Sequence, residues 1–492
     1  MNTPFLPALR PLLAPMGRRH RHPGRCLQAA TLSQVEQTLA PALPAGLFQK
    51  PSSGPHSRQR VFDLARTFWC WVWQVFQANT SCREVVRQIQ ALRGILEQSP
   101  IDEDNSAYCQ ARLKLSLPLL QKIFLATAQS AQQNAPRSHL LQGRPLKIAD
   151  GATVRLEDTP KNRRAFPPSS NQFGRPAFPL MKLVVLFSLA SGAVLAHATG
   201  CLQQSEMRLL LSLSAQLQPG DILCADRAYG QYVLLHWLRG LQVDAVARVN
   251  TLSRHVDFRQ AIKKLGPGDG LFLWRKPNVP SKLLSAQQWA QVPETMIVRL
   301  VQTRINKPGF RTRHLTAVTT LLDAHKYPAH EILQAYLHRW RLELCVDDLK
   351  TTLGMEKLHC RTPESAQREL LVFLSAHNFI RWIMAQAACH SGANLERISF
   401  KGSLDAFRQW SMALVQVRGR SKVRKQKILW HQLLDTLAAD LVPYRPGRQE
   451  PRAVKKRSKY PRLTQSRQRY VERWSRNKRR RVARAKRRQQ LN

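Results

Sequence analysis

Acidic residues are scarce in this chain of 492 residues, where 31 aspartates and glutamates stand against 77 lysines and arginines. The formal net charge at pH 7 is therefore +46, and basic residues crowd the segment 444–492 while also occurring throughout the rest of the chain. Lysine and arginine that neutralise a polyanion release its condensed counterions and so gain affinity for it. The charge predicts a nucleic-acid partner, with an anionic membrane surface as the weaker alternative.

Long apolar runs are also missing. The longest, at about 183–190, has the length of a strand, whereas a membrane-spanning helix needs roughly 18 apolar residues. The amino terminus contains basic residues and leucine, but four prolines interrupt its first fifteen positions: Pro4, Pro7, Pro11 and Pro15. We therefore expect no membrane partner and no signal peptide, and a protein that works in the cytoplasm with the nucleoid.

Paired cysteine motifs are absent too. The nine cysteines are odd in number and include no C-x2-C pair, which disfavours a disulfide framework and a zinc knuckle. Two histidines and two cysteines are close in sequence, but their spacing matches no tetrahedral metal template. They are His338, Cys345, His359 and Cys360.

What the chain does contain is enough apolar sequence, 43% of its residues, to build two or three domains. A proline-rich, irregular lead-in covers residues 1–58, and helical sequence covers 59–143. Strands and helices alternate in 144–250, a β-rich insertion follows at 251–326, and a helix with its flanks occupies 327–368. A helical region at 369–443 precedes a basic tail, 444–492, which we expect to be disordered until it meets DNA. The helices of 59–143 fit either a helix-turn-helix or a plain bundle.

Two aspartates follow predicted strands in the segment 144–250. The expected series is strands at 145–150, 180–190 and 193–200, a helix at 205–217, a strand at 221–225, a helix at 231–241 and a strand at 244–249. Asp150 ends the first strand and Asp226 follows the fourth. Mixed sheets with flanking helices carry their sites at strand ends, so both acids are placed like functional residues.

A third acid lies in the pattern Y-x2-R-x3-E-x6-K. The pattern is formed by Tyr336, Arg339, Glu343 and Lys350. One continuous helix, starting near Pro328 and stopping at Gly354, would present these four side chains in a stripe about 60° wide. We therefore predict that a single helix face carries one acid, two bases and a phenol.

More than one role is possible for the charged residues on that helix face. Arg339 and Lys350 would flank Glu343 and could hold phosphates, the arginine through a bidentate fork. The plainer interpretation is an ion pair between Arg339 and Glu343, four residues apart. Asp347 also falls on the stripe and is an alternative third acid.

Three carboxylates delivered by two strand ends and a helix suit two-metal phosphoryl transfer. Hard cations such as Mg²⁺ or Mn²⁺ prefer carboxylate oxygens to cysteine or histidine. Two such ions activate an attacking oxygen and stabilise the leaving one. Each acid alone would be read as a solvated loop charge; it is their joint occurrence that favours a site.

The ordered motifs resemble the insertion-sequence-four family of DDE transposases. The resemblance runs from about residue 59 to 368 and rests on D-G-A-T-V from Asp150, E-D-T-P at 157–160 with Asn162, G-D-I-L-C-A-D-R-A-Y ending at Tyr229, and the Y-R-E-K pattern. It implies an α/β fold with a ribonuclease-H-like mixed sheet and flanking helices, interrupted by the β-rich insertion. A helical DNA-binding domain at 59–143 would precede this core, and a helical region with the basic tail would follow it.

The resemblance also implies the activity. Asp150, Asp226 and Glu343 would be the catalytic, metal-binding acids, with two Mg²⁺ or Mn²⁺ ions, and Tyr336, Arg339 and Lys350 would contact DNA phosphates. The reaction would be cut-and-paste transposition through a hairpin, from inverted-repeat ends to target DNA, with a dimer on the double-stranded DNA. A non-catalytic or domesticated DNA-binding protein is the alternative, and a nuclease without strand transfer is a third reading.

Other residues have weaker functional readings. Asp158, Thr159 and Asn162 fit side-chain capping of a turn as well as a DNA contact. Trp274 and Trp340 could stack on an unpaired base, although core packing is the plainer role.

Overall fold

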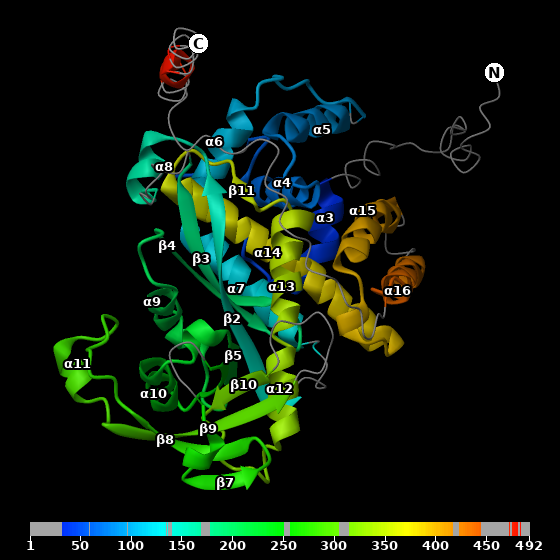
Figure 1. Cartoon of the computed structure of the whole chain (residues 1–492). Helices are drawn as coiled ribbons and strands as arrows, with labels where there is room; N and C mark the ends of the chain where they lie inside the picture. Colours follow the sequence, from blue (N-terminus) through cyan, green and yellow to red (C-terminus); the bar gives the residue numbers. More distant parts are fainter. Residues whose placement is uncertain are drawn as a thin grey trace, which may run out of the picture. The chain divides into compact units, whose positions relative to one another are not determined.

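The computed structural model describes residues 32–58, 60–95, 97–133, 135, 140–168, 178–249, 256–304, 314–416, 423–443, 472, 475–480 and 483. The chain forms two compact units (Figure 1). The first comprises 1–134, 352–354 and 371–442, and the second comprises 135–351, 355–370 and 443–492. Residues 1–31 of the expected lead-in and most of the expected basic tail lie outside the described residues.

The first unit is helical. Its helices are α3 (Leu32–Leu39), α4 (Leu64–Phe76), α5 (Cys82–Ile95), α6 (Ser106–Lys114), α7 (Leu117–Gln133), the later part of α14 (Pro363–Ser391), α15 (Phe400–Gln416) and α16 (Val423–Ala439). Asp63 caps α4 by accepting a hydrogen bond of 2.8 Å from the backbone N–H of Arg66. Trp69 and Trp71 on α4 are each 1% exposed and belong to the core.

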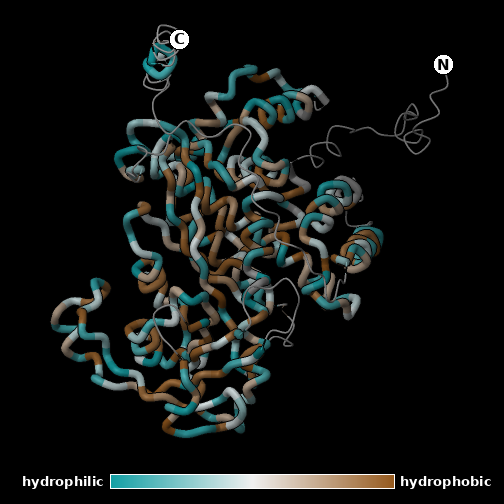
Figure 2. Tube along the Cα trace, viewed as in Figure 1, coloured by the Kyte–Doolittle hydropathy of each residue, from teal (hydrophilic) through white to brown (hydrophobic). Residues whose placement is uncertain are grey.

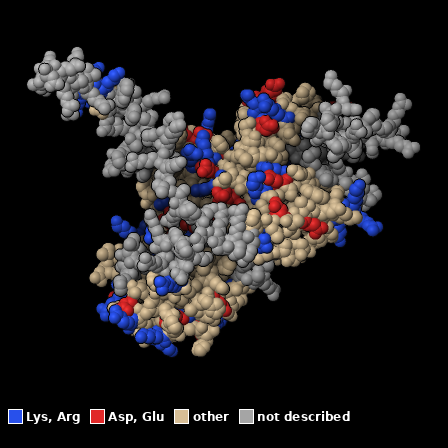
Figure 3. All heavy atoms as spheres, turned by 45° about the vertical axis from the view of Figure 1, so that its right-hand side comes forward, with Lys and Arg blue, Asp and Glu red and all other residues tan. Residues whose placement is uncertain are grey.

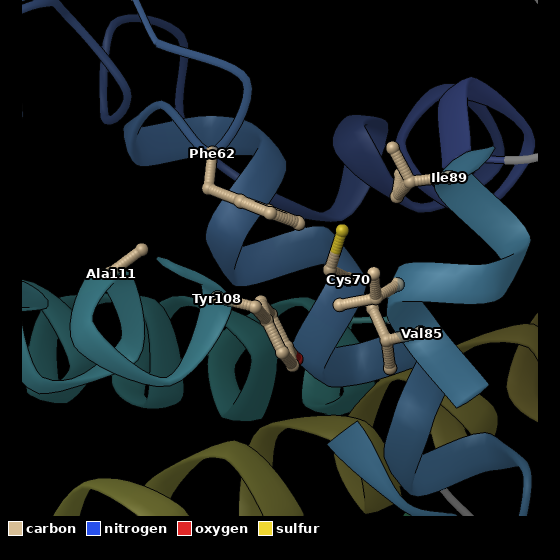
Figure 4. Close-up of a cluster of buried hydrophobic side chains, with 7 residues drawn as sticks. Phe62, Cys70, Val85, Ile89, Tyr108 and Ala111 are labelled. Atoms are coloured by element: carbon tan, nitrogen blue, oxygen red, sulfur yellow. The ribbon is translucent and has the colours of Figure 1, made fainter. Parts of the chain in front are cut away.

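A cluster of buried side chains joins α4, α5 and α6. Figure 4 shows Phe62, Cys70, Val85, Ile89, Tyr108 and Ala111 converging from these helices and the turn before α4. The phenol ring of Tyr108 is fully buried, and its hydroxyl donates to Gln74 at 3.0 Å. A buried phenol with a partner avoids the cost of an unsatisfied polar group.

The second unit is a mixed α/β structure built on one large mixed sheet. Its described strands are β1 (Leu140–Leu141), β2 (Arg144–Leu156), β3 (Leu180–Ser188), β4 (Val194–Gly200), β5 (Ile222–Ala225), β6 (Asp244–Arg248), β7 (Lys263–Gly266), β8 (Asp269–Arg275), β9 (Thr295–Arg304), β10 (His314–Thr319) and β11 (Lys357–Leu358). The order across the sheet is β4-β3-β2-β5-β6-β10-β9-β8-β7, and β1 and β11 also pair with β2. Strands β2, β5 and β6 are parallel, whereas β3 and β4 are antiparallel to their neighbours.

Helices accompany these strands in the second unit. They are α8 (Pro160–Ala165), α9 (Glu206–Leu211), α10 (Tyr232–Gly240), α11 (Ala286–Ala290), α12 (Ala329–Leu337) and α13 (Trp340–Asp347). Helix α9 lies against β3 and β4, α10 against β6, and α13 against β2. The run Leu183 to Phe187 of β3 is almost fully buried, and Figure 2 shows hydrophobic positions concentrated along the central strands. The order of strands and helices predicted for 144–250 is confirmed. The helix expected at 205–217 is shorter, because α9 ends at Leu211 and a separate 3-10 turn follows at Ser214–Gln216.

The first strand is longer than predicted. The expected end at Asp150 is wrong, because β2 continues to Leu156 and stays paired with β3 from Lys147 to Arg155. Gly151 interrupts the apolar pattern at this point, so the sequence alone suggested a strand end.

The single helix predicted from Pro328 to Gly354 is also wrong. Helix α12 ends at Leu337, α13 runs from Trp340 to Asp347, and a π-helix covers Asp348–Thr352. Between α12 and α13 the backbone hydrogen bonds tighten, because the N–H of Arg339 donates to the carbonyl of Tyr336 at 3.0 Å. The stop at Gly354 is confirmed by its φ of 84°, which favours glycine.

The β-rich segment at 251–326 extends the main sheet. Strand β10 pairs with β6, and β9, β8 and β7 continue outward from β10. None of the described helices has both the length and the apolar composition needed to cross a membrane.

Candidate active site

Asp150 and Asp226 occupy the same level on neighbouring parallel strands. Ala149 of β2 pairs with Ala225 of β5, and each aspartate is the next residue along its strand. Strand β5 ends at Ala225, so Asp226 begins a short 3-10 turn, Arg227–Tyr229. Adjacent strands lie about 4.8 Å apart, so the pairing brings the two predicted acids together.

The edge of β2 is open beside these acids. Strand β5 pairs with β2 only as far as Ala149, and β11 resumes parallel pairing at Arg155. Among the described strands, none pairs with this edge from 150 to 154. A charged ligand can therefore approach the acids without breaking a strand pairing.

Burial and like charges oppose ionisation of Asp150. Burial raises the pKa of this carboxyl, and the nearby charges of Asp226 and Glu206 raise it further. The backbone N–H of Gly151, which donates to Asp150 Oδ1 at 2.8 Å, and the charge of Arg339 act in the opposite direction. The net shift is upward, and burial is its largest cause.

Arg339 links the acids to the Y-R-E-K pattern. Burial disfavours its charge, but Tyr336, Asp226 and Glu343 outweigh burial and raise the pKa of the guanidinium. Its Nη2 lies 3.5 Å from Glu343 Oε1, and its guanidinium lies 5.8 Å from the centre of the Tyr336 ring. Its buried Nε has no hydrogen-bond partner among the described residues, so one donor is available to a ligand.

The remaining candidates lie less centrally. Glu343 has a side chain 42% exposed and reaches the acids through its ion pair with Arg339. Lys350 falls in the π-helix and makes no hydrogen bond or ion pair with the described acids. The rival acid Asp347 accepts a hydrogen bond of 2.6 Å from the hydroxyl of Thr351. The structure therefore brings Asp150, Asp226 and Arg339 together.

Sequence reasoning missed Glu206. This half-buried residue opens α9, and its carboxylate lies close enough to Asp150 and Tyr229 to raise the pKa of both. Its only sequence signal is its place in the helix that follows the third predicted strand. That position becomes meaningful only once α9 is packed on β3 and β4.

The motif at 157–162 is a helix cap. Thr159 accepts the backbone N–H of Asn162 at 3.2 Å, and its hydroxyl donates to the carbonyl of Arg361 at 2.8 Å. The amide of Asn162 donates to the carbonyls of Glu157 and Cys360. The capping interpretation of Thr159 and Asn162 is thus confirmed.

Trp274 and Trp340 are the two tryptophans with a possible base-stacking role. Trp274 is 6% exposed, which confirms core packing. The side chain of Trp340 lies outside the described residues.

With this geometry established, comparison with known proteins identifies the chain. The family model for the transposase DDE domain matches residues 141–379, which include both aspartates and the Y-R-E-K pattern. The chain is 28% identical over 419 residues to transposase InsG of insertion sequence element IS4 from Escherichia coli (strain K12), covering 82% of this chain and 88% of the relative. The match to the transposase DDE domain and the similarity to InsG over most of the chain support an insertion-sequence-four DDE transposase.

Two further similarities are weaker. InsZ from Escherichia coli (strain K12) is 29% identical over 226 residues, covering 43% of this chain and 75% of InsZ. A solved structure of the piggyBac transposase synaptic complex with hairpin DNA aligns with a TM-score of 0.38 and 11% identity, covering 89% of both chains. A similarity at that TM-score carries no argument about this chain.

DDE transposases generally use divalent metal ions. The chemistry of the donors fits such ions in part, because Asp150 and Asp226 offer paired carboxylates and the buried hydroxyl of Tyr229 has no hydrogen-bond partner among the described residues. In the part of the chain that the structure describes, no three His, Cys, Asp or Glu side chains are close enough to hold a metal ion. Glu343 pairs with Arg339 and does not complete such a group.

Proposed function

We propose that this transposase moves an insertion sequence by cut-and-paste transposition. It would cleave double-stranded DNA at the inverted-repeat ends, pass through a hairpin on the transposon end, and join the 3′-hydroxyl ends to target DNA. The level pairing of Asp150 with Asp226 at the open edge of β2 is the observation that carries the proposal. The sheet that holds them supports a ribonuclease-H-like core, with residues 144–250 and 327–368 as its two parts and the β-rich insertion at 251–326 between them.

Asp150, Asp226 and Glu343 are the proposed catalytic acids and metal ligands. Two Mg²⁺ or Mn²⁺ ions bound there would supply activation of the attacking oxygen and stabilisation of the leaving oxygen. The protein provides a fixed pair of carboxylates on two hydrogen-bonded strands, which need little rearrangement. Glu343 would join the two aspartates when a phosphate replaces it as the partner of Arg339.

Arg339, Tyr336 and Lys350 are the proposed phosphate-binding residues. Arg339 is the best placed, because it lies within electrostatic range of Asp226 and has an unused buried donor. A guanidinium can grip two phosphate oxygens at once, which fixes the scissile phosphate beside the acids. Tyr336, 6% exposed, holds the Arg339 side chain through its ring and hydroxyl.

DNA is the proposed partner throughout. The net charge of +46 favours a polyanion, and Figure 3 shows lysines and arginines in several places on the face in view. We assign DNA binding to the helical segment 59–143 and further contacts to the helical region 369–443 and the basic tail 444–492. Joining two transposon ends calls for a dimer on DNA, and the substrate puts the protein in the cytoplasm with the nucleoid.

The alternative is a non-catalytic, domesticated DNA-binding protein. The intact acids and the Y-R-E-K residues argue against it, because a protein acting through charge alone has no use for two carboxylates held together next to DNA.

Analysis of the products tests the proposal. Purified protein is incubated with a duplex carrying the flanking inverted repeat, a supercoiled target plasmid, and either Mg²⁺ or EDTA. We expect cleavage at the repeat boundary, a hairpin and joined DNA in Mg²⁺ alone. Nicks without joined DNA would show a nuclease, and binding without any cleavage in Mg²⁺ or Mn²⁺ would establish the non-catalytic alternative.

A further inference from the structure

Glu206 is held at the acid pair by local structure. Ser205 caps α9 by accepting the backbone N–H of Arg208 at 3.2 Å, which fixes Glu206 as the first helical residue. Helix α9 packs against β3 and β4, the two strands on one side of β2. The carboxylate of Glu206 therefore reaches β2 from helix α9, which is distant from β2 in the sequence.

The glycine after Asp150 makes room for that carboxylate. A Cβ built on Gly151 would lie 2.5 Å from Glu206 Cδ and 2.7 Å from each of its carboxylate oxygens. Any side chain at this position would displace the carboxylate. Glu206 thus lies directly over the backbone of the residue that follows Asp150.

A buried phenol, that of Tyr229, lies close to the same carboxylates. Tyr229, in the turn that follows Asp226, is 2% exposed, and its hydroxyl lies beside the Glu206 carboxylate but makes no hydrogen bond of normal geometry in the described part of the chain. Glu206, Asp150 and Asp226 all lie within electrostatic range of it. Buried polar groups are normally satisfied by protein or ordered water, so this hydroxyl faces a place for a further polar group.

A purely structural role does not account for Glu206. Within the described residues it forms no ion pair, and it lies close enough to Asp150 for the two carboxylates to repel each other. Arg339 offsets part of the negative charge at Asp150, and a bound divalent ion would offset more of it.

We propose that Glu206 is a positioning residue for the divalent ion held by Asp150 and Asp226, accepting hydrogen bonds from water bound to that ion. The hydroxyl of Tyr229 bonds to the same water. This inference rests on the proposed function, because it needs the metal that the acids are proposed to hold. Acting through water agrees with the geometry of the described residues, among which no three acids are close enough to coordinate one ion directly.

Binding of Mn²⁺ tests the proposal without relying on activity. The full chain is titrated with Mn²⁺ by electron paramagnetic resonance as wild type, Glu206→Gln and a control, Glu294→Gln, whose side chain is 85% exposed and pairs with Lys276. Loss of a residue that orients a metal's surroundings typically weakens affinity about 10- to 100-fold. We expect a loss of this size for Glu206→Gln, none for Glu294→Gln, and recovery of DNA cleavage by Glu206→Gln at raised Mn²⁺. Melting temperatures show that each variant is folded.

A second variant keeps the negative charge of Glu206 but changes the position of its carboxylate. Gly151→Ala displaces the Glu206 carboxylate, so it should weaken Mn²⁺ binding in the same direction, and the double variant should be no weaker than Glu206→Gln alone. Mn²⁺ binding by Glu206→Gln equal to that of the wild type overturns the inference and leaves the proposed function standing. Absence of Mn²⁺ binding by the wild type overturns both.

Discussion

Asp150 and Asp226 stand level on two hydrogen-bonded parallel strands, because Ala149 and Ala225 before them are paired. The pairing forces two like charges together in a partly buried place, and the pKa of Asp150 is raised by burial and by Asp226. A fold that holds two carboxylates against their repulsion is suited to bind a cation or cationic group between them.

The coupling of the two acids is measurable. Asp226→Asn removes one of the charges that raise the pKa of Asp150, so the Asp150 carboxyl should titrate at lower pH in this variant. Asp150 stays buried in this variant, so part of the upward shift of its pKa should persist. Carbon-13 NMR of labelled aspartate in metal-free protein follows the titration. Asp158→Asn, at an exposed ion pair with Arg163, is the control and should leave Asp150 unchanged; an unchanged value in Asp226→Asn would mean that the two acids do not interact.

Arg339 should not be replaceable by lysine. Arg339→Lys keeps the charge but loses the planar fork, and losing a hydrogen bond to a charged group costs about 1.5–3 kcal/mol, on the order of ten- to a hundredfold in cleavage rate. Arg368→Lys is the matched control, because Arg368 also pairs with a glutamate four residues away, at 2.6 Å. The measurement is the single-turnover cleavage rate of the inverted-repeat duplex. Equal rates for the two variants would show that Arg339 acts only as a surface ion pair.

The strands that carry the acids depend on a buried ion pair. Lys147 of β2 lies 2.5 Å from Asp221, which precedes β5, and their side chains are only 9% and 5% exposed. Asp221→Asn leaves the lysine without its charged partner, which costs about 3–5 kcal/mol for a buried pair. Asp158→Asn at the exposed pair should cost about 1 kcal/mol or less. Hydrogen exchange of the β2 and β5 amides measures both, and similar protection in the two variants would contradict the prediction.

Cys82 in the helical unit should be a reactive thiol. Its pKa is lowered to about 6, first by a hydrogen bond from Cys109 and also by Arg112, whose Nη1 lies 2.9 Å from the sulfur. The thiolate therefore predominates above about pH 6, and alkylation by iodoacetamide should be rapid at pH 7 and fall as the pH drops through 6. Arg112→Gln should raise the pKa and slow the reaction at pH 7, while the exposed Cys389 serves as an internal control in the same mass spectrum. A Cys82 rate at pH 7 that Arg112→Gln leaves unchanged would rule out this cause.

Much of the central sheet could be predicted from sequence, because its strands are short apolar runs between turn residues. The place of Asp226 at the end of β5 followed from the buried run before it. The length of β2 did not, since Gly151 breaks the pattern while β3 continues to pair with it. The extension of the sheet by β10 beside β6 was also hidden, because strand neighbours are set by long-range pairing.

The site was less predictable than the sheet. The break between α12 and α13 falls at His338 and Arg339, with no glycine or proline to announce it. A helix wheel assumes one continuous helix, so the predicted 60° stripe does not hold across the break and the π-helix. Glu206 escaped notice because only the packing of α9 on the sheet brings it to Gly151.

The central claim is that the acid pair of β2 and β5 performs DNA cleavage. The most direct measurement is a denaturing-gel assay of wild type, Asp150→Asn, Asp226→Asn and the control Asp158→Asn on end-labelled duplex carrying the flanking inverted repeat, in Mg²⁺. We predict cleavage at the repeat boundary by the wild type and Asp158→Asn, and none by the other two variants, although all four bind the duplex equally. Cleavage retained by Asp150→Asn or Asp226→Asn would remove that residue from the active site and contradict the account.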